Sequence, residues 1–287
     1  MKARIYFLLA MLGILLISCN VSPVDSMEAD DTPLILQSYP SFDVEEMYDT
    51  ELLPIDDKLI ILIREGQVYL DNPTPPQISI GIYTAREYPH SGYSLSRYVD
   101  VSPGNIEFRF AGVLQYFGMW PSFGPAVTSQ LFAISNGDYT LRIKYQFQED
   151  LYNLKVTDEY IRLIPVDTNF TEPRYELYWR YVPGSFAYIC KASTEMSYLC
   201  DYFADTLLSE IDLEEFYYPD SGWIPYERSW NDKHVRYFIY ESESDYDHAV
   251  EILEAFTHDH IMQREIRITL RNWMSERYGS FNFDNWK

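Results

Sequence analysis

The segment that sets the main expectation for the fold is Asn136-Gly137-Asp138-Tyr139-Thr140-Leu141-Arg142-Ile143-Lys144-Tyr145. Its first three residues are a turn signal, because asparagine, glycine and aspartate tolerate the backbone angles of tight turns. From Tyr139 onward, large apolar or aromatic residues alternate with polar ones, and this period of two is typical of a strand with one buried face. The segment therefore predicts a turn that leads into a half-buried β-strand.

Segments of the same kind recur along residues 34–168. We expect strands at Lys58–Arg64, Gln67–Leu70, Gln77–Thr84, Tyr93–Val99, Asn105–Phe110, Tyr139–Phe147 and Tyr160–Ile164. Short strands at this spacing favour an antiparallel β-sandwich. The turn followed by Tyr-x-Leu-x-Ile-x-Tyr resembles the penultimate strand of immunoglobulin-like and fibronectin-like sandwiches. That resemblance implies that the Tyr139 hydroxyl bonds back to the backbone at the corner of the strand.

Residues 174–287 have a different character. In chain order we expect a strand at Phe186–Lys191, a helix at Thr194–Leu208, a hairpin of Trp223–Ser229 with Val235–Tyr240, a helix at Asp245–His258 and a strand at Glu265–Arg271. The order βαββαβ is that of a ferredoxin-like domain. The expected fold class is therefore α+β, with an N-terminal antiparallel immunoglobulin-like β-sandwich followed by a ferredoxin-like βαββαβ domain.

Both expected helices carry an apolar stripe at helical spacing. The stripes are Met196, Leu199, Cys200, Phe203 and Leu207 on the first helix, and Ala249, Ile252, Leu253 and Phe256 on the second. We expect them to cover one face of the sheet. The other face should then present Ile189, Arg236, Phe238, Tyr240, Arg267 and Arg271. We expect it to dock on the sandwich or on a partner protein, since a bare face would be an unusually large exposed patch.

The first 18 residues are typical of a signal peptide. Lys2 and Arg4 precede an apolar run from Ile5 to Ile17, which is short for a membrane span. Leu16-Ile17-Ser18-Cys19 then resembles the lipobox of bacterial lipoproteins. That resemblance implies cleavage before Cys19 and attachment of diacylglycerol, with further acylation such as palmitate, to this residue. An ordinary cleaved signal peptide and a short membrane anchor are the alternatives.

The residues after Cys19 bear on location. Residues 19–33 are polar and acidic, and we expect them to form a tether between lipid and fold. Asn20 in place of aspartate implies, under the enteric sorting rule, the outer membrane rather than the inner membrane. The acidic residues resemble the surface-export signals of Bacteroidota lipoproteins, and they are Asp25, Glu28, Asp30 and Asp31. The expected location is therefore the cell envelope, with lipid as the anchor.

The charge of the chain excludes one class of partner. The chain has 22 Lys+Arg and 44 Asp+Glu, a formal charge of -22. Without Lys2 and Arg4 the balance is 20 against 44, or -24. Such a charge repels nucleic acid and anionic lipid. We therefore expect no nucleic-acid partner.

Two cysteines lie beyond Cys19. Cys190 falls near the end of an expected strand, and Cys200 lies on the buried stripe of the helix that should cover it. A disulfide between them is allowed if the chain is exported, because exported proteins meet an oxidising environment. Two buried free thiols are the alternative. The sequence leaves both possibilities open.

An aromatic run, Tyr116-Phe117-Gly118-Met119-Trp120-Pro121-Ser122-Phe123-Gly124-Pro125, is the candidate ligand site. Its rings stand among glycine and proline in an expected loop, and exposed rings of this kind stack on sugars or peptides. The candidate binding residues are Tyr116, Phe117, Trp120 and Phe123. The alternative is that the run packs between the two domains, and this is the favoured interpretation.

A cluster on the second helix contains the candidate metal ligands. It consists of His248, Glu251, Glu254, His258 and His260, of which Glu254 and His258 are the candidates. Carboxylate and imidazole ligands suit a divalent ion, but the cluster lacks the His-Glu-x-x-His spacing of zinc peptidases. A solvated helix face explains the same residues through ordinary helix chemistry. We therefore predict no metal and no cofactor.

The sequence contains none of the common catalytic signatures. It has no Gly-x-Ser-x-Gly, no phosphate-binding loop, no dinucleotide fingerprint and no Asp-x-Asp-x-Asp-Gly calcium loop. The expected function is that of a lipid-anchored, non-enzymatic envelope protein that recognises a protein or a glycan. The alternatives are an exported metal-dependent enzyme or hydrolase, and a structural subunit of an envelope lipoprotein complex.

Overall fold

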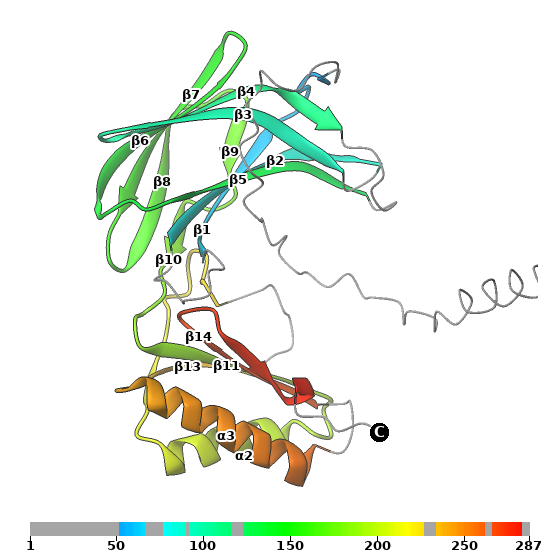
Figure 1. The fold of residues 1–287 in the computed structure, drawn as a ribbon, viewed down its shortest axis with the longest axis vertical. Coiled ribbons are helices and arrows are strands. Elements are labelled where there is room, and N and C mark those ends of the chain that lie inside the picture. The colour runs from blue at the N-terminus through cyan, green and yellow to red at the C-terminus, as the bar shows by residue number, and fades with distance from the viewer. Residues whose placement is uncertain are drawn as a thin grey trace, which may run out of the picture. The chain divides into compact units, whose positions relative to one another are not determined.

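The computed structural model describes residues 52–66, 77–89, 92–115, 123–226, 234–261 and 266–282. Strands account for 56% of the structure and helices for 16%. The chain is therefore mostly β, and its strands form two sheets of ten and five strands (Figure 1).

The ten-stranded sheet is curled and mixed. Its strands are β1 (Leu59–Gly66), β2 (Gln77–Tyr88), β3 (Tyr93–Ser102), β4 (Asn105–Gln115), β5 (Gly124–Phe132), β6 (Gly137–Tyr145), β7 (Gln148–Val156), β8 (Tyr160–Asp167), β9 (Thr171–Pro173) and β10 (Leu177–Trp179). They lie in the order β10-β8-β7-β6-β4-β3-β5-β2-β1-β9. Neighbours are antiparallel except at β4 with β6, β1 with β9, and β3 with β5.

One core fills the apolar side of this sheet. Alternate residues of the strands point to it, as Leu141, Ile143 and Tyr145 do on β6. The residues between them, Arg142 and Lys144, lie on the other face of the sheet, where they pair with acidic side chains. The period of two in the sequence therefore determines which face is buried.

A buried carboxylate joins two strands that are not neighbours in the sheet. Asp150 on β7 is fully buried and accepts the backbone N–H groups of Asn169, Phe170 and Thr171 at 2.8, 3.0 and 2.7 Å. The Thr171 hydroxyl donates to the same carboxylate at 2.6 Å. Thr171 begins β9, which is the edge strand at the opposite end of the sheet from β10. These bonds therefore connect β7 to that edge strand and stabilise the curled shape of the sheet.

The expected immunoglobulin-like sandwich is wrong. One curled mixed sheet replaces the two packed antiparallel sheets of a sandwich. Residues 126–129 of β5 are all buried, so this strand has no alternation and was not predicted. β7 was not predicted either, because the expected strand Tyr139–Phe147 ran through the turn before it. The expected strand Gln67–Leu70 lies outside the described residues.

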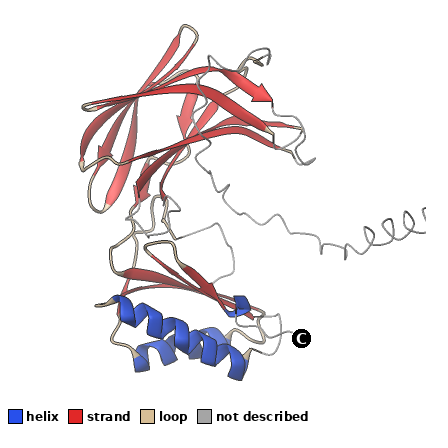
Figure 2. Ribbon diagram, in the orientation of Figure 1, coloured by secondary structure: helices blue, strands red, loops and turns tan. Residues whose placement is uncertain are grey.

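The five-stranded sheet is antiparallel throughout, in the order β12-β13-β11-β14-β15. Its elements are β11 (Ser185–Ala192), α2 (Tyr198–Glu210), β12 (Glu214–Phe216), β13 (His234–Ile239), α3 (Glu243–His260), β14 (Ile266–Asn272), β15 (Arg277–Gly279) and the short 3-10 helix η2 (Ser280–Asn282). Both α-helices lie on one face of the sheet (Figure 2). Their buried residues include the two predicted apolar stripes apart from Met196, which is partly buried.

The expected α+β ferredoxin-like domain is also wrong. The chain is mostly β, with two α-helices among the described residues and a sheet of five strands instead of four. Over residues 223–226 and 235–240, the part of the predicted Trp223–Ser229 and Val235–Tyr240 hairpin that the structure describes, the two segments are not paired with each other. The strands beside β13 are β12 and β11, which both lie earlier in the chain, while Trp223 forms a bridge with Tyr178 of β10. Propensity favoured Trp223 as a strand residue, but its long-range partner could not be inferred from it.

The predicted open face of this sheet needs a correction on β13. Ile189 pairs with Val235, so Val235 and Tyr237 share its face, and Arg236, Phe238 and Tyr240 were assigned to the wrong face. Arg236 pairs with Tyr188 on the helix-covered side, where Phe238 and Tyr240 pack in the core. Both faces of β13 carry large apolar residues, so alternation alone could not distinguish them. The open face, to which Phe216 of β12 also contributes, packs against residues that include Tyr181, Tyr218, Ile224, Tyr226 and Trp273.

Candidate functional site

The candidate ligand site is the aromatic run between β4 and β5. Tyr116, Phe117 and Trp120 lie outside the described residues, and Phe123 directly precedes β5. The Phe123 side chain is 77% exposed. Its ring is therefore not packed into the body of the protein, which weighs against the packing interpretation for this residue.

An irregularity in β2 positions the start of β5. The pairing register of the two strands shifts between Tyr83 and Glu87. Inside this shift the buried Thr84 hydroxyl accepts the Ala126 N–H at 2.9 Å and donates to the Arg86 carbonyl at 2.8 Å. Bulges of this kind redirect a strand and often lie beside functional loops. The result is a fixed base from which Phe123 projects.

Stacked tyrosines lie beneath this base. Tyr88, which pairs with Gly124, stacks on Tyr93 with ring centroids 4.4 Å apart, and both rings are buried. Arg86 lies over the Tyr88 ring at 5.4 Å and pairs with Asp56 at 2.8 Å. Burial, with the nearby Asp56 carboxylate, raises the pKa of Tyr88 above its ordinary value. Tyr88 is therefore uncharged at neutral pH, and its stack with Tyr93 forms part of the packing beside Gly124.

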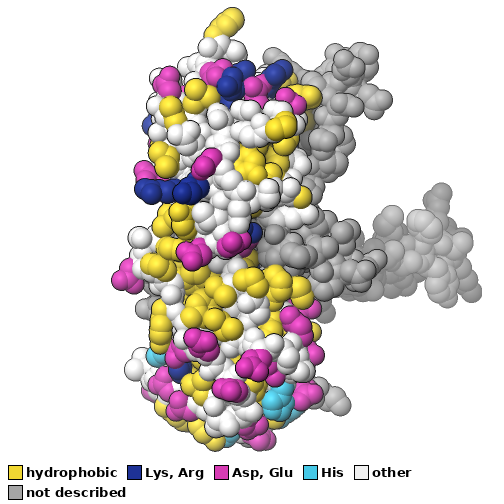
Figure 3. Space-filling view, turned by 90° about the vertical axis from the view of Figure 1, so that its left-hand side faces the viewer, with side chains coloured by type: hydrophobic (Ala, Val, Ile, Leu, Met, Phe, Trp, Pro, Cys, Tyr) yellow, Lys and Arg dark blue, Asp and Glu magenta, His cyan; other side chains and the backbone are white. Residues whose placement is uncertain are grey.

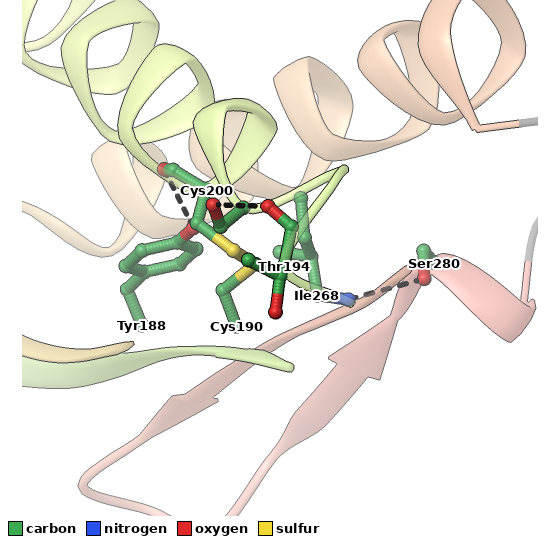
Figure 4. The surroundings of a disulfide bond; sticks show 7 residues. Tyr188, Cys190, Thr194, Cys200, Ile268 and Ser280 are labelled. Atoms are coloured by element: carbon green, nitrogen blue, oxygen red, sulfur yellow. Dashed lines mark hydrogen bonds between the residues drawn. A yellow bond between two sulfur atoms is a disulfide. The ribbon is translucent and has the colours of Figure 1, made fainter. Parts of the chain in front are cut away.

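Cys190 and Cys200 are joined by a disulfide (Figure 4). The bond connects β11 to α2, with an S–S distance of 2.03 Å and a Cα–Cα distance of 5.7 Å. Both residues are fully buried, and the Tyr188 hydroxyl donates to the Cys200 carbonyl at 2.7 Å beside them. The bond is therefore part of the core and not an accessible redox site.

The candidate metal ligands do not converge. Glu254 and His258 are both exposed on α3. His248 lies 3.3 Å from Glu251 and 4.0 Å from Glu210, while His260 packs against Tyr202 and Phe256 with centroid distances of 5.3 and 4.6 Å. Within the described part of the chain, no three His, Cys, Asp or Glu residues gather as a metal site would require.

Three further observations concern the predicted residues. Cys19 lies outside the described ranges, so the structure does not report on the lipobox. The Tyr139 hydroxyl does bond back to the backbone, donating to the Ser135 carbonyl at 2.8 Å, although the surrounding fold is not a sandwich. Across the ranges that the structure describes, no helix has the length and apolar character to cross a bilayer.

An exposed ring at the β6–β7 turn was not predicted from the sequence. Phe147 is fully exposed, at 104% of its reference area. The segment Tyr145-Gln146-Phe147-Gln148 places two aromatic residues two positions apart, and this spacing suggested a continuing strand. A turn at Gln146-Phe147 has no glycine, proline or asparagine to signal it.

One face of the protein shows how its charges are distributed. In the face drawn in Figure 3, acidic side chains of the described residues are scattered between hydrophobic ones. On the outer side of β4, β6 and β7, Glu107 pairs with Arg109 and with Lys144, whose amino group lies 3.1 Å away. Opposite charges therefore neutralise each other locally, as on an ordinary solvated sheet face.

Comparison with known proteins gave no match. No protein-family model, no curated protein and no solved structure resembles this chain closely enough to be significant.

Proposed function

We propose that the protein is a lipid-anchored, non-enzymatic binding or assembly protein of the bacterial cell envelope. Cys19 carries the lipid, and the outer membrane is the favoured location. The aromatic run Tyr116–Pro125 recognises a protein or a glycan. The observation that carries the binding role is the 77% exposure of Phe123.

An exposed phenylalanine ring is unfavourable in water, because apolar surface has an unfavourable hydration free energy. Burying such a side chain stabilises a complex by roughly 1.5–3 kcal/mol. Aromatic anchors of this kind are enriched at the centres of binding interfaces, and rings also stack on sugars. Phe123 projects from a fixed base that includes the buried Thr84 and the stacked Tyr88 and Tyr93. A rigid support lowers the entropy that an exposed ring loses on binding.

The test compares the wild-type chain with Phe123→Ser and Trp120→Ala in cells. Tyr98→Ser is the matched control, because Tyr98 is a 58% exposed ring on β3, outside the run. Chemical crosslinking in membranes, followed by mass spectrometry, reports a protein ligand, and binding to purified envelope polysaccharide reports a glycan.

We expect the wild type and Tyr98→Ser to bind the same ligand. We expect Phe123→Ser and Trp120→Ala to lose most of the bound ligand. Equal recovery from all four chains, or no specific ligand for the wild type, would contradict the proposal.

A further inference from the structure

The tip of the β6–β7 hairpin presents an apolar ring to solvent. Tyr145 pairs with Gln148, so Gln146 and Phe147 form a two-residue turn. This hairpin projects from the top of the sheet in Figure 1. Phe147 at its tip is fully exposed, the largest exposure among the large hydrophobic residues that the structure describes. A ring in this position contributes nothing to the core.

The backbone of the turn is also unfavourable for its sequence. Gln146 has φ 52°, in the left-handed region that two-residue hairpin turns use and that glycine or asparagine normally occupies. A non-glycine residue there costs free energy. Strained backbone and exposed apolar residues that break local rules are concentrated at functional sites.

Two more apolar residues lie beside this hairpin. Leu52 and Leu53 are each 37% exposed, and Leu53 forms a bridge with Val113 of β4. The Tyr145 hydroxyl accepts the Ile55 N–H at 2.9 Å and the Gln146 side-chain amide at 3.2 Å. The segment that starts at Leu52 is thus attached to the base of the turn. We call Leu52, Leu53 and Phe147 the tip patch.

We propose that the tip patch contacts the lipid bilayer to which Cys19 anchors the chain. This inference rests on the proposed function, because it uses the lipid anchor to choose the bilayer as the occupant. The chain that comes from Cys19 enters the described fold at Leu52, within the patch itself. The covalent connection from the anchor therefore reaches the described fold at the exposed apolar side chains.

The length of that path favours repeated contact. Residues 20–51 can span at most about 110 Å when extended. A site tethered within this distance of a surface meets it at a raised effective concentration, so a weak contact is populated.

The local chemistry of the turn fits a bilayer better than the rest of the chain does. Gln146, Phe147 and Gln148 carry no charge, whereas the chain as a whole carries -22. A neutral turn with one ring can enter the interface between headgroups and acyl chains without bringing a carboxylate with it. The contact should therefore form on uncharged lipid and need no basic residues.

The test uses the full mature chain with Cys19→Ser, so that no acyl chain is present. Co-sedimentation with phosphatidylcholine vesicles is measured over rising lipid concentration for this chain, for its Phe147→Ser variant and for its Tyr98→Ser variant. Phe147 is fully exposed, so its replacement leaves the fold intact, which circular dichroism verifies.

We expect weak binding at millimolar lipid that Phe147→Ser reduces about tenfold and Tyr98→Ser leaves unchanged. No binding by the parent chain, equal binding by Phe147→Ser, or binding that requires phosphatidylglycerol would overturn the inference. Because this assay contains no lipid anchor, its result is independent of whether Cys19 is acylated in cells.

Discussion

At the scale of single residues, Asp150 has the clearest structural role in the ten-stranded sheet. Its buried carboxylate accepts three backbone N–H groups and one hydroxyl from residues 169–171. No pattern in the sequence marked it, because an aspartate at the start of a strand resembles any turn residue. Its hydrogen-bond partners are adjacent to one another in the chain but distant from Asp150. The role of Asp150 can therefore be recognised from the folded structure and not from the sequence.

Replacing Asp150 with asparagine should destabilise the fold by about 2–4 kcal/mol, since an amide N–H₂ would face backbone donors in a buried site. Urea unfolding followed by far-ultraviolet circular dichroism measures the loss. The control is Asp167→Asn, because Asp167 on β8 is exposed. Equal stabilities of the two variants would contradict this role.

A second residue-scale prediction concerns Glu215 and Arg236. The Arg236 guanidinium donates to both carboxylate oxygens, at 2.7 and 2.6 Å, across β12 and β13. These bonds hold the pKa of Glu215 below its ordinary value. A lowered folded pKa means that the stabilisation is present above the unfolded pKa, near 4.5, and is lost as the pH falls through the folded value.

Glu215→Gln should therefore lower the free energy of unfolding by about 1 kcal/mol at pH 7, and by progressively less below pH 4.5. Parallel urea titrations of wild type and variant at several pH values measure this. A difference that stays constant from pH 7 to pH 3 would show that the pair contributes no charge-dependent stability.

At the scale of elements, the helices could be predicted and several strands could not. The stripe of Leu199, Phe203 and Leu207 repeats at helical spacing, and α2 buries all three. In contrast, β5 has no alternation because it is buried on both faces, and β12 has only three residues. Periodicity identifies elements with one buried face, so it fails where both faces are covered or where a strand is too short.

The disulfide gives the element-scale prediction. Cys190 and Cys200 close a short loop between β11 and α2, with a sequence separation of 10. Removing the cross-link in a Cys190→Ala, Cys200→Ala double variant should cost about 2–3 kcal/mol, chiefly because the unfolded chain gains entropy.

Urea unfolding with and without a reductant measures this effect. The wild type should lose stability on reduction, and the double variant should not respond. A wild type whose stability is unchanged by full reduction would contradict the assignment.

At the scale of the whole molecule, the strand order was beyond prediction. Positions of most strands follow from alternation and turns, but the pairing of β1 with β9 or of β4 with β6 joins segments far apart in the chain. Such pairings depend on the packing of complete faces, and local patterns do not encode them. The aromatic run was identified as a candidate site from residue types alone, whereas Phe147 had no recognisable turn signal.

Glu65 and Arg180 connect β1 with the segment that leads into the five-stranded sheet. Arg180 pairs with the nearly buried Glu65 carboxylate at 2.7 Å, and the Tyr181 N–H donates to the same group at 2.7 Å. Glu65→Gln should cost about 3 kcal/mol, because it leaves the Arg180 charge without its partner in a partly buried site.

The control for this variant is Glu172→Gln, whose partner Lys58 is exposed and whose loss should cost less than about 1 kcal/mol. Thermal unfolding of both variants provides the comparison. A Glu65→Gln chain as stable as Glu172→Gln would contradict a role for Glu65 in joining the two regions.

The central claim is that Cys19 carries the lipid that places this fold in the envelope. Metabolic labelling with an alkyne analogue of palmitate, followed by membrane fractionation of wild type and Cys19→Ser, tests it most directly. We predict that the wild type incorporates the label and sediments with membranes, and that Cys19→Ser incorporates none. A wild type without label, or a Cys19→Ser chain that is labelled as strongly as the wild type, would contradict the claim.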